Sequence, residues 1–212
     1  MGDFMISVTL VLLLLLYLGI LPNSLNIIAI SGIIVSLLVK FNKLFSKPVM
    51  WYLLFFVLGA LAIIFYQEPY LRFFARGFIG YGFFLIVMFV GVVPNKWGVT
   101  RVVKKNRGVL SILGFLAITP HAFLHVFGIW GGIDLFGIAA YVIMVPLTFI
   151  SFRTIRKQIP VKDWFTIQKA AYAIYLILFV HLLLVSAWEN KIVYAVLLTL
   201  YVNNKLLKEF RK

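Results

Sequence analysis

The chain has no cysteine, only six acidic residues and only three histidines among its 212 residues. Without cysteine the protein cannot form a disulfide, a thiolate-bound iron–sulfur cluster, or a covalent haem attached through a C-x-x-C-H motif. A haem held by histidine without a covalent link is still allowed. Because the chain has 20 lysines and arginines but only six acidic residues, its formal net charge is +14.

Charge of either sign is scarce, since charged residues make up 12% of the chain and hydrophobic residues 64%. Soluble domains are about a quarter charged and about half apolar, so we expect one membrane domain whose main surrounding is the lipid bilayer. The basic residues fall in short loops between apolar stretches and do not form one patch. This distribution argues against nucleic acid as a partner.

About eight apolar stretches are predicted to cross the membrane, judged against the roughly 20 residues that a bilayer requires. They are residues 4–21, 25–40, 49–66, 77–94, 109–128, 134–155, 165–187 and 190–204. The second is short and the last marginal, so six or seven spans are alternatives. The first lacks the basic start and the small-residue cleavage site of a signal peptide, and we expect a retained helix. The predicted fold is an all-α integral membrane bundle.

Most basic residues lie in alternate connections of this predicted bundle and in the tail: Lys40, Lys43, Lys47, Lys96, Arg101, Lys104, Lys105, Arg107, Arg153, Arg156, Lys157, Lys162, Lys205, Lys208, Arg211 and Lys212. Because lysine and arginine favour the cytoplasmic side, both termini are predicted to be cytoplasmic. Lys169 falls just inside the cytoplasmic end of span seven, and Lys191 lies on the outer side. Arg72 and Arg76, also outside, either snorkel from helix ends or meet an anion.

All three histidines lie inside predicted spans, His121 and His125 in the fifth and His181 in the seventh. Both spans run outwards, and a rise of about 1.5 Å per residue puts His125 and His181 at one depth in the outer half. His121 is one turn deeper on nearly the same face, and Pro120 is expected to bend the helix beside it. Ionisable side chains inside a membrane are costly and usually functional.

The histidines allow several interpretations. The acidic residues Asp134, Glu68, Glu189 and Asp163 all lie near span ends, so we predict no acidic partner for the histidines within a span. This disfavours a proton relay or cation transport. A three-histidine zinc or copper site is also disfavoured, because two of its ligands would have to come from one face of one helix. Ligation of one haem by a histidine from each of two helices fits best. The alternative is a haem-free membrane protein, structural or transporting, whose histidines line a cavity.

Several short stretches appear in order after Trp51: ARGFIGYGF, VVPNKWGVTRVVKKNRGVLSILGFL, HAFLHVFGIW, GIAAYVIMVPLTFISFRTIRKQIPVKDWFTIQKAAYAIYLILFVHLLL and YVNNKLLKEFRK. Together they resemble the ferric reductase-like transmembrane family, and within it the haem-binding membrane subunit of the bacterial methionine sulfoxide reductase system. The leucine–histidine ending span five and the late histidine of span seven are the most specific points. Residues 1–45 have no counterpart, so we predict an N-terminal transmembrane hairpin followed by a six-helix haem-binding domain at 46–212.

The resemblance implies one haem b in the outer half of the membrane, held by His125 and His181. His121 would be an alternative ligand or a neighbouring group, and Arg76 and Arg72 would pair with the haem propionates. In the family, a further histidine stands at the position that is Gln168 here. The matching region of span five reads Ser111 and Ile112, so a second, inner haem is not expected.

The implied function is that of a membrane b-type cytochrome, an electron-transfer subunit of an oxidoreductase in the bacterial cytoplasmic membrane. Its acceptor would be an extracytoplasmic reductase subunit or ferric iron. Its donor would be a quinol bound near Trp164, Gln168 and Lys169, or a cytosolic flavin (FMN) reductase docked on the basic loops. Without a quinol, Trp164 is explained as an aromatic residue at the membrane interface. Lys169 is explained as a lysine that snorkels to that interface. No G-x-G-x-x-G fingerprint is present, so we do not expect hydride chemistry on this chain.

Overall fold

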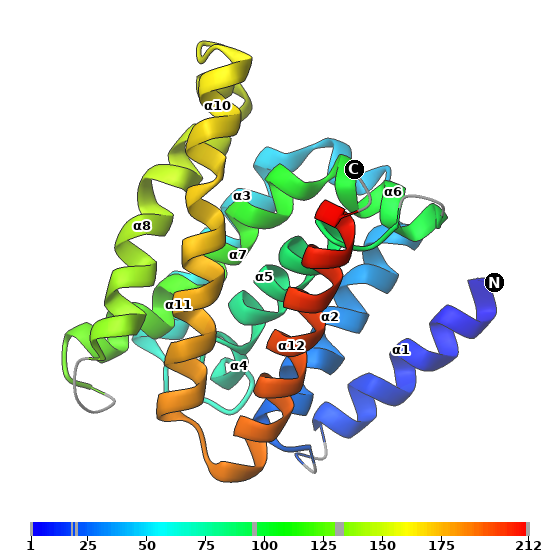
Figure 1. Cartoon of the computed structure of the whole chain (residues 1–212). Helices are drawn as coiled ribbons and strands as arrows, with labels where there is room; N and C mark the ends of the chain where they lie inside the picture. Colours follow the sequence, from blue (N-terminus) through cyan, green and yellow to red (C-terminus); the bar gives the residue numbers. More distant parts are fainter. Residues whose placement is uncertain (1, 18, 20, 95–96, 130–133, 211–212) are drawn as a thin grey trace.

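The computed structural model describes residues 2–17, 19, 21–94, 97–129 and 134–210, which fold into helices with no β-strand among them. The helices are α1 (Gly2–Tyr17), α2 (Asn23–Lys40), the short 3₁₀ turn η1 (Leu44–Ser46), α3 (Pro48–Ile64), α4 (Arg72–Ala75), α5 (Phe78–Val90), α6 (Gly98–Lys105), α7 (Arg107–Val126), α8 (Leu135–Ser151), α9 (Arg153–Arg156), α10 (Val161–Gln168), α11 (Ala170–Val185) and α12 (Trp188–Phe210) (Figure 1). The predicted all-α class is confirmed.

Each predicted span coincides with one of the longer described helices, namely α1, α2, α3, α5, α7, α8, α11 and α12. Among the described residues, three stretches are long and apolar enough to cross a membrane: α2, α7, and α10 with α11 taken together as Val161–Val185. Helices α3, α5 and α8 are apolar but shorter. The chain is therefore a helical membrane protein by length and composition, while the count of eight spans stays a prediction.

A few residues determine where helices begin and end. Pro48 is the first residue of α3, where its missing N–H costs no hydrogen bond. Asp134 precedes α8, and its side chain accepts a hydrogen bond from the Gly137 N–H, which satisfies one of the free donors of the first turn. Near the chain end, the Lys208 ammonium donates to the Gly91 carbonyl at 2.5 Å. This contact joins the last turn of α12 to the end of α5, where a cation is favoured.

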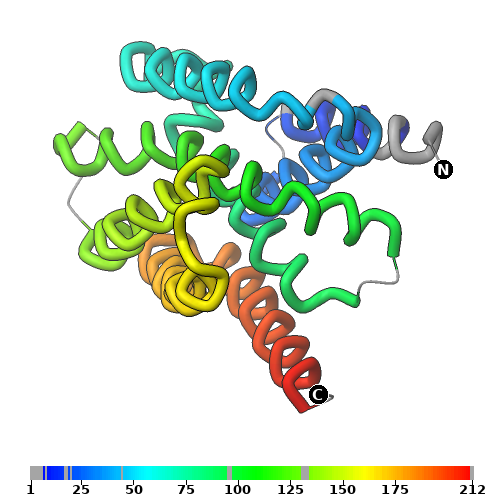
Figure 2. Tube along the Cα trace, turned by 90° about the horizontal axis from the view of Figure 1, so that it is seen from above, coloured from blue at the N-terminus to red at the C-terminus, as the bar shows by residue number. Residues whose placement is uncertain are grey.

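The bundle is organised around α5 and α7, which pack against each other at its centre. Helices α3 and α4 cover one side of α7, and α2 covers α5. Helices α8 and α11 form a pair beyond α7, and α12 lies between α11 and α2. Helix α1 lies at the edge, against α2 (Figures 1 and 2). Helix α6, helix α10 and the end of α12 lie at one end of the bundle, whereas α4 lies at the other (Figure 1).

Helices α5 and α7 approach so closely at Gly80 that a side chain does not fit there. A Cβ atom on Gly80 would lie 2.7 Å from the Ile118 Cβ and 2.8 Å from the Ile118 backbone nitrogen. Gly114 of α7 faces Phe83 in the same way, with 2.9 Å between the two Cβ positions. Apolar helices gain little hydrophobic energy from associating in lipid, so close packing at small residues contributes much of the attraction. This crossing fixes the segment of α7 that leads into the histidines.

Polar contacts attach α2 to the rest of the bundle. The Ser31 hydroxyl donates to the Gly82 carbonyl of α5 at 3.1 Å. The backbone N–H of Ser24, which is fully buried, donates to the Asn190 side-chain oxygen of α12 at 2.7 Å. Residues 1–45, predicted as a hairpin of their own, are thus tied through α2 to helices from the middle and the end of the chain.

Candidate functional site

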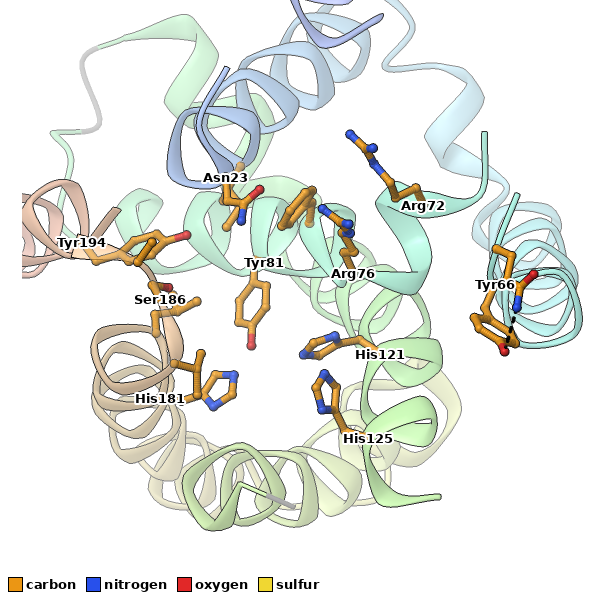
Figure 3. A pocket seen from close by; sticks show the side chains of 16 residues that line it. Asn23, Tyr66, Arg72, Arg76, Tyr81, His121, His125, His181, Ser186 and Tyr194 are labelled. Atoms are coloured by element: carbon orange, nitrogen blue, oxygen red, sulfur yellow. Dashed lines mark hydrogen bonds between the residues drawn. The ribbon is translucent and has the colours of Figure 1, made fainter. Parts of the chain in front are cut away.

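The three histidines line a cavity together with Arg72 of α4, the helix that lies at the end of the bundle opposite α6 and α10 (Figure 1). His121 and His125 of α7 and His181 of α11 line one cavity of about 740 Å³ and a second of about 260 Å³. Figure 3 shows His181 on one side and His121 and His125 on the other. The ring centroids of His121 and His181 are 6.5 Å apart, and those of His121 and His125 are 4.6 Å apart. The larger cavity lies within the size range of small-molecule sites.

Tyr81 of α5 stands between the two groups of histidines. Its ring centroid lies 6.3 Å from that of His181, nearly parallel to it, and 6.1 Å from that of His121. Its hydroxyl is directed into the space between the histidines (Figure 3). Tyr81 was not among the site residues predicted from the sequence. Tyr81 lies near the outer end of predicted span four, at the predicted depth of the histidines. This match in depth could have identified it as a site residue.

His181 has an acidic partner, so the prediction that the histidines lack one was wrong. The Nδ1 atom of His181 donates to Asp134 Oδ2 at 2.5 Å, and the same oxygen accepts from the Gly137 N–H at 2.5 Å. His181 itself is buried, with 7% of its surface exposed. Asp134 immediately precedes α8, and the packing of α8 against α11 brings it next to His181. With Nδ1 committed to the carboxylate, Nε2 is the nitrogen left to bind a ligand.

His121 carries a buried polar atom without a partner. Its Nδ1 has no hydrogen bond to any described residue. Buried polar atoms are nearly always hydrogen-bonded, and one that is not costs free energy. The unpaired nitrogen belongs to a side chain that lines both cavities. It therefore indicates that a polar group of a ligand belongs beside it.

Arg72 and Arg76 line the larger cavity from α4 and the residue after it (Figure 3). Neither forms an ion pair with an acidic residue in the part of the chain that the structure describes. Burial, followed by the positive charge of Arg72, lowers the pKa of Arg76 from its ordinary value. Arginine nevertheless stays protonated. Two adjacent guanidinium groups without a carboxylate favour an anion, and a carboxylate matches their geometry.

The residues predicted to bind a donor lie in different surroundings. Gln168 lines a small cavity of about 50 Å³ together with Ser111, the position compared above with an inner histidine of the family. The guanidinium carbon of Arg156 lies over the Trp164 ring, 4.2 Å from the ring centroid. The Trp164 Nε1 atom is buried and has no hydrogen-bond partner among the described residues. Lys169 is exposed where α10 meets α11.

Replacing Gly137 with valine is expected to displace the His181 ring. A Cβ atom on Gly137 would lie 3.2 Å from Nδ1 and Cε1 of His181 and 3.1 Å from Asp134 Oδ2. Valine adds two further methyl groups, so the free energy of unfolding should fall by about 2 kcal/mol. Thermal unfolding in detergent measures the loss. Gly98→Ala is the control, because nothing lies within 4 Å of its Cβ position; equal melting of both variants would contradict the prediction.

The site thus combines three imidazoles from two helices, a carboxylate that orients one of them, a buried tyrosine, and a rim with two arginines. The resemblance to the ferric reductase-like family stays a prediction from the residues. Comparisons of the chain with protein-family models, with curated proteins and with solved structures find no match.

Proposed function

We propose that the chain is a membrane b-type cytochrome that relays single electrons through one haem to an extracytoplasmic acceptor. The observation that carries the proposal is the arrangement of α7 and α11 around a shared cavity. His125 and His121 approach it from one helix, and His181, held by Asp134, approaches it from the other. Two imidazoles that face each other across a cavity are the donor set of a haem bound without a covalent link.

The donor set suits a haem better than a bare metal ion. Among the described residues, no three His, Cys, Asp or Glu side chains converge as ligands of one ion. The cavity of about 260 Å³ has apolar walls that include Ile118, Ile138, Val142 and Leu178, and such walls suit the faces of a macrocycle. The arginines that line the larger cavity would receive the two propionates.

Each residue of the site has a role in the proposal. His125 and His181 would bind the haem iron, and a haem held by two histidines would supply electron transfer in preference to oxygen binding. Asp134 holds the His181 ring in one orientation. Arg76 and Arg72 neutralise the propionates, and His121 is a polar neighbour beside His125.

In the proposed arrangement, eight helices cross the bacterial cytoplasmic membrane with both termini in the cytoplasm, and the haem lies in the outer half. The histidines share a cavity with Arg72 of α4, and α4 lies at the opposite end of the bundle from α6, α10 and the end of α12 (Figure 1), which supports this orientation. The acceptor would be a reductase subunit or ferric iron. The donor would be a quinol at the inner end, near Trp164, Gln168 and Lys169, or a cytosolic flavin (FMN) reductase. The resemblance to the ferric reductase-like family supports the same function.

Protein purified in detergent after expression with added haem is expected to contain one haem per chain. Its reduced-minus-oxidised spectrum should show the sharp bands of a six-coordinate b-type haem, because both axial ligands come from the protein. The measurement is the visible spectrum together with haem quantified against protein. If the purified protein contains no haem, the cytochrome proposal is contradicted. That result would favour a haem-free membrane protein with a histidine-lined cavity. Two haems per chain would contradict the single site.

A further inference from the structure

The carboxylate of Asp134 is a feature that ligation of an iron does not by itself require. A ligand histidine can be oriented by a backbone carbonyl or by water as well as by a carboxylate. Here the His181 Nδ1 instead contacts Asp134 Oδ2 at 2.5 Å. The Asp134 side chain is itself partly withdrawn from solvent, with 27% of its surface exposed. The contact thus keeps a negative charge, at a partly exposed position, next to a buried imidazole.

The position of this carboxylate is fixed from more than one side. Its Oδ2 also accepts from the Gly137 N–H, which attaches it to the first turn of α8. Gly137 leaves just enough space, because a Cβ there would be within 3.2 Å of both the His181 ring and the carboxylate. An ionised carboxylate can only accept hydrogen bonds. The His181 Nδ1 must therefore carry the proton, which leaves the Nε2 lone pair for a ligand.

This contact has a chemical consequence for anything bound at Nε2. A carboxylate partner raises the basicity of the imidazole, and its negative charge acts strongly where the local dielectric is low. Both effects favour the ferric state of a bound iron, because that state carries one more positive charge than the ferrous state. Removal of the charge should therefore make reduction easier.

We propose that Asp134 is a positioning residue that fixes His181 as the Nδ1–H tautomer and lowers the reduction potential of the haem. This inference rests on the proposed cytochrome function. It assigns to one residue at the start of α8 the control of how readily the centre releases its electron to the acceptor.

The test compares two substitutions that keep the helix cap. Asparagine and serine are both good N-cap residues, so Asp134→Asn and Asp134→Ser should each retain the bond to the Gly137 N–H. Asparagine removes the charge, and serine is also too short to reach His181. Glu189→Gln is the matched control, because it removes an exposed carboxylate from the first turn of α12.

Redox titration should show that Asp134→Asn keeps its haem and is about tenfold easier to reduce, a rise of about 59 mV for a one-electron couple. Glu189→Gln should stay within about threefold of the wild type, or about 28 mV on the same scale. Independently of haem, ¹⁵N-histidine NMR of the haem-free wild type should show His181 as the Nδ1–H tautomer with a strongly downfield proton. That signal should be lost in Asp134→Ser.

Unchanged potentials and unchanged NMR signals in both Asp134 variants would overturn this inference while the cytochrome proposal stands. Haem loss from Asp134→Asn would support positioning if the haem-free variant melts like the haem-free wild type, because bound haem itself stabilises the fold. Haem loss with a lower melting temperature of the haem-free variant would show a structural cap only and would overturn it. Absence of haem from the wild type would overturn both proposals, and the haem quantification made beforehand identifies that case.

Discussion

His181→Leu is expected to lose haem almost completely, and so is His125→Leu, while both proteins stay folded. Each substitution removes one of the two nitrogens that would hold the iron from opposite helices. Even residues that only orient a metal ligand contribute about 10–100-fold to affinity, so loss of a ligand itself should lower haem content by at least that factor. Leucine fills similar space, and in His181→Leu the Asp134 carboxylate keeps its bond to Gly137. Haem per chain and the thermal melt, taken together, measure both expectations.

His121→Leu is the matched control on the same helix. It should keep the haem, because His121 is assigned a neighbouring role one turn from His125. If His121→Leu loses haem and His125→Leu keeps it, the ligand is one turn deeper than proposed. If all three variants bind haem like the wild type, the histidines are not its ligands.

Gly80→Ala is expected to lower the free energy of unfolding by about 3 kcal/mol, at the upper end of the usual cost of overpacking. Alanine is the better helix former by about 1 kcal/mol, but the clash should outweigh that gain. Its Cβ would lie within 2.9 Å of the Ile118 Cβ, backbone nitrogen and Cα. Backbone atoms cannot rotate away, so α5 and α7 would have to separate, and haem content should fall as well.

Thermal unfolding in detergent is the measurement for this variant, and Gly98→Ala again serves as the control because its Cβ position is open. A melting temperature for Gly80→Ala equal to that of the control would show that the two central helices tolerate a wider separation. The site would then depend less on this crossing than the structure indicates.

The helices could be predicted from the sequence because a lipid bilayer allows few backbone conformations. An apolar run in a bilayer must satisfy its own backbone hydrogen bonds, and a helix does so within one segment. The meeting of His181 with His125 and His121 could also be predicted, because depth along two helices of the same direction follows from residue number alone. The described helices coincide with these predicted segments.

The partners of the histidines could not be predicted in the same way. Asp134 was assigned to a span end and was not paired with a histidine, because counting along one span does not reveal which helix lies next to it. Only the packing of α8 against α11 brings it to His181. Gln168 and Lys169 were predicted near one donor site, and neighbours in sequence point in different directions on a helix. One lines a cavity and the other is exposed.

The contact between Ser24 and Asn190 joins segments that are 166 residues apart in the sequence, so α2 is made well before its partner α12. Both helices also contribute walls to the larger cavity, through Asn23 and Tyr194. During synthesis at the ribosome, the cavity therefore lacks one wall until α12 has been inserted. A chain truncated before α12 would therefore retain the histidines without this wall of the cavity.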